Sequence, residues 1–271
     1  MKDFDGRRVL ITGSGRGIGR AMALRFARAG AEVVISDKDE DAVAAVVAEI
    51  GVLGGKARAL VFDVTDPPAV QAAHDRLRRE AGPIDVLVNN AGVVFGGPFL
   101  EVPLERHWLT YRINVLGLAA VTHAFLPDLI ARPEAHLVNV ASASGYIGLP
   151  LGSTYASSKW AVLGFSESIR LELHMLGYDH VAVTEVCPSY VDTGLFAGAN
   201  PPRTTRLLTP ERLADLTFEA VRRKRRVVRV PWLVKVTPLL KGCLPGAWFD
   251  RVSALFGATH SMGRWTGRRT G

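Results

Sequence analysis

Cysteine is scarce in this chain: the 271 residues include two, Cys187 and Cys243. Two cysteines that lie far apart make no disulfide framework, and they lack the close spacing of metal ligands, so we expect no metal site. The N-terminus also lacks the charged segment, apolar segment and small-residue cleavage site that mark secretion. We therefore expect a reducing, cytoplasmic compartment.

Uninterrupted apolar runs of membrane-spanning length are missing as well. The stretch 227–255 is apolar, but charged residues and prolines interrupt it, so it is not expected to be a transmembrane helix. Acidic residues are few near the C-terminus, where residues 203–271 hold 15 Lys and Arg against 4 Asp and Glu. The run Arg222–Arg226 could be a nucleic-acid patch, a membrane-surface anchor or a solvated helix end. Because no nucleic-acid-binding motif accompanies it, no nucleic-acid partner is expected.

Short apolar segments alternate with amphipathic segments over most of the chain. The strands are expected at residues 9–11, 32–35, 59–62, 86–88, 136–140 and 181–186, and the helices at 17–29, 40–51, 67–80, 103–130 and 154–176. Most strand segments are too apolar to have a wet face, as in parallel sheets covered by helices on both sides. Asp66 and Thr209 each precede a proline, which is typical of a helix N-cap. The pattern predicts an α/β fold with a doubly wound parallel sheet (Rossmann-type) of about seven strands.

A glycine-rich turn follows the first strand, with the sequence Thr12-Gly13-Ser14-Gly15-Arg16-Gly17-Ile18-Gly19. Such a turn lets the backbone approach a pyrophosphate and points N–H groups and the positive end of the helix dipole at it. Asp37 ends the next strand, where a carboxylate accepts hydrogen bonds from ribose hydroxyls and repels a 2′-phosphate. This favours NAD over NADP as the cofactor, although Arg16 is a cation that could meet a phosphate. The alternative role for Asp37 is a helix cap.

The spacing Thr-Gly-x-x-x-Gly-x-Gly resembles the short-chain dehydrogenase/reductase family, and further family motifs follow in order over about residues 7–195. The resemblance implies that Asp63 and Val64 contact adenine, and that Asn90, Ala91 and Gly92 line the cofactor. It also implies that Asn114 is a catalytic residue that positions a water in a proton relay. Members of the family pair through two long helices, so the resemblance implies a homodimer or homotetramer.

The segment Tyr155-Ala156-Ser157-Ser158-Lys159 places a phenol and an ammonium one helical turn apart, on one face of a helix. An ordinary tyrosine has a pKa near 10, and a nearby cation favours the phenolate. We therefore expect Lys159 to lower the pKa of Tyr155 toward the working pH, where proton transfer is most efficient. A core tyrosine with a surface lysine is the alternative for this spacing alone.

Ser142 lies 13 residues before Tyr155, at the end of the fifth strand, and its hydroxyl is expected to hydrogen-bond the reacting oxygen. Ser144 is the neighbouring alternative, although Ser142 matches the family spacing better. The resemblance further implies that Lys159 holds the nicotinamide ribose. After the sixth strand it implies cofactor contacts from Pro188, Val191 and Thr193. Ser189 replaces the glycine usual in the family, which puts the backbone path there in doubt.

The expected substrate pocket adjoins Ser142 and Tyr155, and its candidate walls are mostly apolar: Val94, Phe95, Ile147, Leu149, Tyr190, Leu195 and Phe196. Such a pocket suits a lipophilic substrate. The segments 191–198 and 243–262 resemble the branch of the family that holds retinol dehydrogenases and some hydroxysteroid dehydrogenases. That branch acts on lipid alcohols, often at membranes.

These features predict an oxidoreductase that transfers a hydride between NAD(H) and a lipophilic alcohol or carbonyl resembling a retinoid, steroid or fatty alcohol. The alternatives are an NADPH-dependent ketoreductase of a small or acyl-type carbonyl, and a non-catalytic dinucleotide-sensing scaffold. We expect residues 1–230 to form the dinucleotide-binding and catalytic domain, and 231–271 a C-terminal extension. The residues after about Val227 are expected to cover the substrate pocket and to rest against a membrane surface. The alternative is that they pack onto the main domain or a neighbouring subunit.

Overall fold

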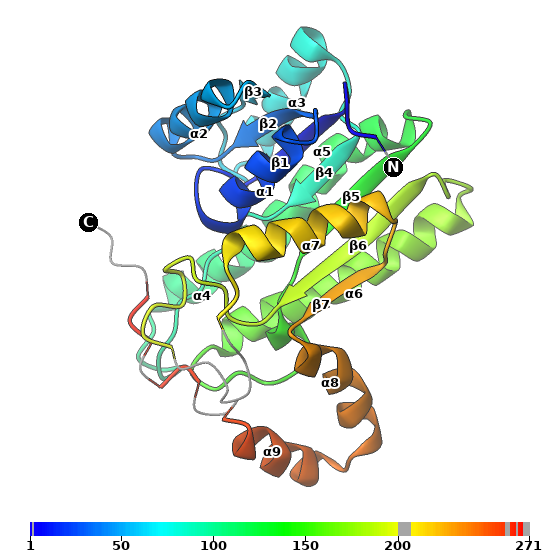
Figure 1. The fold of residues 1–271 in the computed structure, drawn as a ribbon. Helices are drawn as coiled ribbons and strands as arrows, with labels where there is room; N and C mark the ends of the chain where they lie inside the picture. The colour runs from blue at the N-terminus through cyan, green and yellow to red at the C-terminus, as the bar shows by residue number, and fades with distance from the viewer. Residues whose placement is uncertain (2, 200–206, 258–260, 264, 268–271) are drawn as a thin grey trace.

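Seven parallel strands form one sheet in the computed structural model, which describes residues 1, 3–199, 207–257, 261–263 and 265–267. The strands are β1 (Arg8–Thr12), β2 (Glu32–Ser36), β3 (Lys56–Ala59), β4 (Val86–Asn89), β5 (Ala135–Val140), β6 (Val181–Pro188) and β7 (Val227–Val230). Their order across the sheet is β3-β2-β1-β4-β5-β6-β7 (Figure 1). The chain moves outward in opposite directions from β1 and β4, so ligands are expected beyond the carboxyl ends of these two strands.

Helices cover both faces of the sheet, which confirms the predicted doubly wound fold. The helices are α1 (Gly17–Ala27), α2 (Glu40–Val52), α3 (Pro67–Ala81), α4 (Leu104–Tyr111), α5 (Leu118–Ile130), α6 (Ser153–Met175), α7 (Pro210–Arg222), α8 (Trp232–Cys243) and α9 (Gly246–Leu255). The β1 side chains alternate between two cores: Val9 and Ile11 pack on the side of α1, α2 and α7, and Leu10 on the side of α3, α5 and α6. This two-sided burial explains why the central strands are apolar throughout.

The third strand begins and ends earlier than the prediction of 59–62. Residues Lys56–Ala59 pair with β2, and the pairing ends at Ile35 because β2 itself ends at Ser36. Leu60 still donates its N–H to the Ile35 carbonyl, and its side chain is buried. The apolar pattern therefore indicates which side chains are buried, whereas the extent of the partner strand determines which residues form the hydrogen-bonded ladder.

The helix predicted over 103–130 is interrupted by a π-helical turn at Arg112–Gly117 between α4 and α5. The segment Leu104–Ile130 is long enough to span a membrane and contains an 18-residue window of mean hydropathy 1.5, but half of that window is buried inside the protein. Both predicted N-caps are confirmed. Asp66 accepts a hydrogen bond from the N–H of Ala69 (3.1 Å), and Thr209 accepts one from Arg212 (3.2 Å).

The basic run Arg222–Arg226 joins the end of α7 to β7, which corresponds to the helix-end interpretation. Arg222 and Arg223 pair with Glu219, and Lys224 pairs with Glu134 (2.7 Å). The following Val227–Val230 pairs with β6, so these four residues belong to the sheet and not to the cover of the substrate pocket that was expected after about Val227. Helices α8 and α9 then extend below the sheet (Figure 1).

Candidate active site

A cleft of about 750 Å³ lies at the carboxyl ends of the strands, where the loops after β1, β2, β4, β5 and β6 converge. It is lined by fifteen of the residues expected to bind the cofactor: Gly13, Arg16, Gly17, Ile18, Asp37, Asp63, Val64, Asn90, Ala91, Gly92, Tyr155, Lys159, Pro188, Val191 and Thr193. Ser14, Gly15 and Gly19 do not line it. Ser14 is buried beneath the loop, where its hydroxyl donates to the Ile11 carbonyl (2.7 Å) and accepts from the N–H of Ser36 (2.9 Å).

The glycine-rich loop is held close to the loop after β4. Gly13 has a φ of +63°, and a Cβ added there would lie 2.8 Å from the Cα of Ala91. The side-chain amide of Asn90 donates to the carbonyls of Thr12 (2.9 Å) and Gly13 (3.0 Å). Gly13 therefore allows the two loops to approach, and Asn90 fixes them together. The result is an open backbone cradle that leads into the N-terminus of α1, which suits the pyrophosphate of a dinucleotide.

Asp37 lies beside this cradle, where its carboxylate accepts hydrogen bonds from the N–H groups of Gly15 and Asp39 (both 3.3 Å). Arg16, the cation that could meet a phosphate, is paired with Asp39 at 2.7 Å. Asp39 is also the N-cap of α2 and accepts from the N–H of Ala42 (3.1 Å). The sequence indicated Asp37 and Arg16 but not the partner of Arg16, because nothing in the spacing shows which acidic residue the side chain reaches.

Ser142, Tyr155 and Lys159 meet at the inner end of the cleft. Ser142 follows β5, whereas Tyr155 and Lys159 lie in the first two turns of α6, and all three side chains are buried. Ser142 and Tyr155 line the same small pocket, and the Ser142 hydroxyl favours the charged form of the Tyr155 phenol. The Lys159 ammonium donates to the Val140 carbonyl (2.8 Å) and lies 5.8 Å from the centre of the Tyr155 ring.

Burial shifts the pKa values of Tyr155 and Lys159 more than the sequence suggested. It raises the pKa of Tyr155 to about 12, although the Ser142 hydroxyl acts in the opposite direction. The expected lowering of this pKa by Lys159 is therefore not found in the chain by itself. Burial also lowers the pKa of Lys159 to about 8, because the charged ammonium loses its water. Added positive charge in the cleft would be needed to favour the phenolate.

Asn114 lies in the π-helical turn and is almost fully buried. Its amide accepts from the N–H of Val93 (2.9 Å) and donates to the Val93 carbonyl (3.0 Å) and the Ser158 hydroxyl (3.0 Å). Asn114 thus ties the loop after β4 to the helix that carries Tyr155 and Lys159. Interruptions of this kind in a helix are frequent at functional sites.

A smaller, mostly apolar pocket of about 60 Å³ adjoins Tyr155. Its predicted walls are Ser142, Ile147, Leu149, Tyr155, Tyr190 and Phe196, whereas Val94, Phe95 and Leu195 line the neighbouring cleft. Ser144, the alternative to Ser142, also lines this pocket. Its hydroxyl is buried and has no hydrogen-bond partner among the described residues.

The sequence missed several pocket residues. Ser189 contributes to both cavities, and its N–H donates to the Val230 carbonyl (2.8 Å), which continues the contact between β6 and β7. Its φ is not positive, so the backbone there does not require the glycine usual in the family. From the C-terminal extension, Ser261 lines the smaller pocket and Trp265 lines the cleft. No periodicity or motif signals a contact between residues this far apart.

Comparisons with known proteins place the chain in a family: residues 7–204 match the family described as short chain dehydrogenase, and the chain belongs to it. Epidermal retinol dehydrogenase 2 of Homo sapiens is 31% identical over 266 residues, which cover 96% of this chain and 85% of that protein. The predicted resemblance to this family, and to its retinol dehydrogenase branch, is confirmed.

Two further similar proteins differ in sequence identity and in how much of each chain the similarity covers. Probable oxidoreductase EphD of Mycobacterium tuberculosis is 38% identical over 239 residues, which cover 81% of this chain but 40% of EphD, so the chain spans less than half of that relative. A short chain dehydrogenase/reductase from Burkholderia phymatum, solved in complex with NAD, superimposes with a TM-score of 0.82 at 28% identity, covering 96% of this chain and 98% of that one.

Proposed function

We propose that this protein is an oxidoreductase that transfers a hydride between NAD(H) and a lipophilic alcohol or its carbonyl counterpart. One observation carries the proposal: Ser142, Tyr155 and Lys159 lie where the backbone cradle for a dinucleotide meets a mostly apolar pocket. If the substrate oxygen lies beside Ser142 and Tyr155, the carbon bonded to that oxygen would lie close to the part of the cleft that suits the dinucleotide.

The roles of the side chains follow from their contacts. A bound nicotinamide dinucleotide supplies the acceptor for the hydride that leaves the carbinol carbon. Tyr155 takes the proton from the alcohol oxygen, and Ser142 hydrogen-bonds that oxygen while its charge changes. The Lys159 ammonium, together with the positive charge of an oxidised nicotinamide, would favour the phenolate form of Tyr155. Asn114 holds the loop at Val93 against α6. In the reduction of a carbonyl, Tyr155 returns the proton.

The acidic groups beside the cradle support NAD rather than NADP as the cofactor. Asp37 holds a carboxylate at the cleft, where it would meet the adenosine ribose and repel a 2′-phosphate. Arg16 would favour the phosphate, but its pairing with Asp39 offsets that charge. The NADPH-dependent alternative therefore requires Arg16 to leave Asp39 in the bound state.

A panel of alcohols tests the proposed reaction. Purified protein is mixed with NAD or NADP and with retinol, steroid alcohols, 1-decanol or ethanol, and absorbance at 340 nm reports the reduced cofactor. We expect turnover with NAD and the lipophilic alcohols, and little with ethanol or NADP. Dinucleotide binding without turnover of any alcohol or of the matching carbonyls would support the sensing-scaffold alternative instead.

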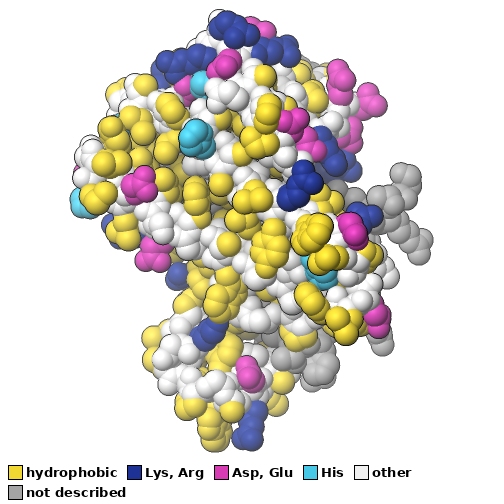
Figure 2. All heavy atoms as spheres, turned by 180° about the vertical axis from the view of Figure 1, so that it is seen from behind, with side chains coloured by type: hydrophobic (Ala, Val, Ile, Leu, Met, Phe, Trp, Pro, Cys, Tyr) yellow, Lys and Arg dark blue, Asp and Glu magenta, His cyan; other side chains and the backbone are white. Residues whose placement is uncertain are grey.

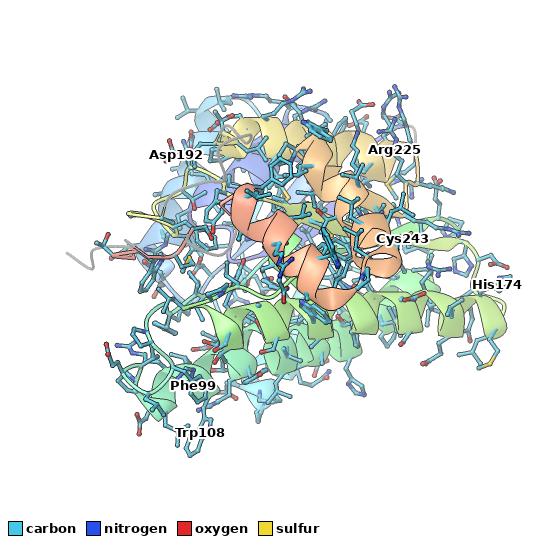
Figure 3. The ribbon with its side chains drawn as sticks, turned by 90° about the horizontal axis from the view of Figure 1, so that it is seen from below. Phe99, Trp108, His174, Asp192, Arg225 and Cys243 are labelled. Atoms are coloured by element: carbon cyan, nitrogen blue, oxygen red, sulfur yellow. The ribbon has the colours of Figure 1, made fainter. Side chains whose placement is uncertain are left out.

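We also propose a homodimer or homotetramer, formed through the face that α4, the π-helical turn and α6 present to solvent. Large apolar side chains gather on the rear face of the molecule (Figure 2), and Trp108 lies at the outer edge of the helical layer (Figure 3). Trp108 and Leu116 are 60% and 62% exposed, and Leu171 and Met175 extend the apolar surface. Light scattering of Trp108→Glu should show smaller assemblies than the unaltered protein, and equal masses would contradict this interface.

For the C-terminal extension we propose a peripheral contact with the cytoplasmic surface of a membrane. Trp232, Lys235 and Leu239 follow one another at helical spacing on α8 and are exposed. Arg251 and Leu255 are one turn apart on α9 and are also exposed. Apolar side chains beside cations are the combination that anionic lipid surfaces bind.

Vesicle sedimentation tests the membrane contact. We expect binding to phosphatidylserine-containing vesicles that weakens with salt and falls severalfold in Lys235→Glu. Lys56→Glu, at the exposed edge strand β3, is the matched control and should bind as the unaltered protein does. Absence of binding at low salt would mean that these side chains have no role at a membrane.

A further inference from the structure

The described part of the C-terminal segment, residues 261–263 and 265–267, returns from α9 to the cleft. We call these six residues the strap. It lies beside the loop that follows β6, and four of its N–H and O–H groups donate hydrogen bonds to that loop. The Thr266 hydroxyl donates to the Ala197 carbonyl (3.2 Å). The N–H groups of Thr266 and Gly267 donate to the Ala197 carbonyl (2.9 and 3.3 Å), and the Trp265 indole donates to the Leu195 carbonyl (3.2 Å).

The strap packs against the catalytic tyrosine as well as the loop. Met262 is buried in one apolar cluster with Val94, Leu149 and Tyr155, and Trp265 packs against this cluster. The approach to the loop after β4 is close, since a Cβ on Gly96 would lie 2.8 Å from the Trp265 ring and 2.9 Å from the Met262 methyl group. Gly96 therefore provides the space in which these two side chains lie.

Ser261 fixes the beginning of the strap to the substrate pocket. It is buried, lines the pocket, and hydrogen-bonds the side chain of Tyr190. Tyr190 contacts Phe196 edge-on at 5.1 Å between ring centres, and Phe196 contacts Tyr155 in the same way at 5.6 Å. A continuous set of contacts therefore leads from the strap to the reacting group.

We infer that Trp265 and Met262 are specificity-determining residues, because together they form an outer wall that limits the apolar part of the substrate. Trp265 lines the cleft with the expected substrate contacts Val94 and Leu195, and Met262 packs behind the pocket walls Leu149 and Tyr155. The inference rests on the proposed function and names the wall of that same site. The pocket beside Tyr155 measures about 60 Å³, so the rest of a bulky apolar substrate must extend into the part of the cleft that Trp265 lines. Shortening either wall side chain enlarges the space available to a bulky alcohol, whereas a small alcohol gains nothing from the added volume.

Kinetics with two substrates test the wall. The kcat/KM for a steroid alcohol relative to 2-butanol is measured with NAD for Trp265→Ala, Met262→Ala and the unaltered protein, without lipid. We expect the ratio to rise at least tenfold in Trp265→Ala and several-fold in Met262→Ala, mainly through a lower KM for the steroid. Trp248→Ala on α9, where the indole is 59% exposed, is the matched control and should keep the original ratio. An unchanged ratio in both wall variants would overturn the inference.

A dye separates the failure of this inference from a failure of the proposed function. If the unaltered protein oxidises no alcohol, the proposed function fails, but the wall can still be tested with 1-anilinonaphthalene-8-sulfonate in the presence of NADH. We expect Trp265→Ala and Met262→Ala to bind the dye several-fold more tightly than Trp248→Ala does, with melting temperatures that show all three to be folded. Equal dye affinities among folded variants would refute the wall.

Discussion

The two sides of the cleft are built differently. On the dinucleotide side, neighbouring strands and loops are joined directly, as where Asn90 holds Thr12 and Gly13 and where Ser14 joins β1 to β2. On the substrate side, the strap rests on another loop and packs mainly through apolar side chains. A cofactor site needs fixed backbone positions, whereas a pocket wall made of side chains can change its selectivity without disturbing the cofactor. We infer that the dinucleotide side is the rigid half and the substrate side the adjustable half.

Tyr155 lies at the border of the two halves, so removal of its hydroxyl should abolish the chemistry and leave both halves intact. We expect Tyr155→Phe to lower kcat by about 10²–10⁴-fold, the range typical of a lost proton-transfer group. The affinity for NADH, measured by fluorescence titration, should change less than about twofold. Retention of more than a few per cent of the original kcat would contradict the role of Tyr155.

Lys159 allows a test through stability and pH. Its pKa is about 8 in the folded protein and 10.5 as its ordinary value, so between these pH values the unfolded chain binds more protons. The free energy of unfolding should therefore rise with pH across this window, by about 3 kcal/mol if Lys159 acts independently. Urea unfolding at pH 7 and pH 10 should show this contribution as the difference between the unaltered protein and Lys159→Met. The exposed Lys235→Met serves as the control, and equal pH dependence in all three would refute the assignment.

The dinucleotide side can be tested at the point where its two loops come closest, between Gly13 and Ala91. Gly13→Ala places a methyl group against Ala91 at a positive φ, so we expect the affinity for NADH to fall by about tenfold or more. Gly54→Ala is the matched control, because Gly54 also has a positive φ (+74°) but no atom within 4 Å of the added Cβ. The control should lose only about 1 kcal/mol of stability, with NADH binding unchanged. Equal losses of binding in both variants would mean that strain, and not the approach of the two loops, is responsible.

The smallest effect is expected for the choice of cofactor. Asp39→Ser keeps an N-capping side chain on α2 but removes the charge that pairs with Arg16. In Asp39→Ser we expect the affinity for NADPH to rise several-fold while the affinity for NADH stays within about twofold. Asp37→Ala should also reduce the difference in affinity between NADH and NADPH. Glu40→Gln, at an exposed neighbour, should leave the preference unchanged. A preference for NADPH in the unaltered protein would show that Arg16 dominates.

The sequence predicted the rigid half more completely than the adjustable half. Val9 and Leu10 are apolar because they are buried on opposite faces of the sheet. Gly13 lies where two loops come close together. At such positions the residue type itself indicates its surroundings. The β3 boundary was misplaced because a ladder depends on where the partner strand ends. The π-helical turn at Asn114 lies within the stretch 103–130, whose helical pattern continues across the turn and shows no break.

Contacts between distant segments left no signal of their own. The pairing of Arg16 with Asp39, and the approach of Met262 and Trp265 to Gly96, depend on how loops fold in space. The pKa of Tyr155 was expected to fall because of Lys159, but the degree of burial that raises it cannot be read from spacing. Charge and apolar content indicated that the extension has a role, but not which of its residues reach the site.

Transfer of a labelled hydrogen tests the central claim most directly. The protein is incubated with NAD and a lipophilic alcohol that carries deuterium on its carbinol carbon, and the NADH formed is analysed by mass spectrometry. We predict that each NADH carries one deuterium, and that Tyr155→Phe forms labelled NADH at least about a hundredfold more slowly. NADH formed without deuterium, or labelled NADH formed equally by Tyr155→Phe, would contradict the account.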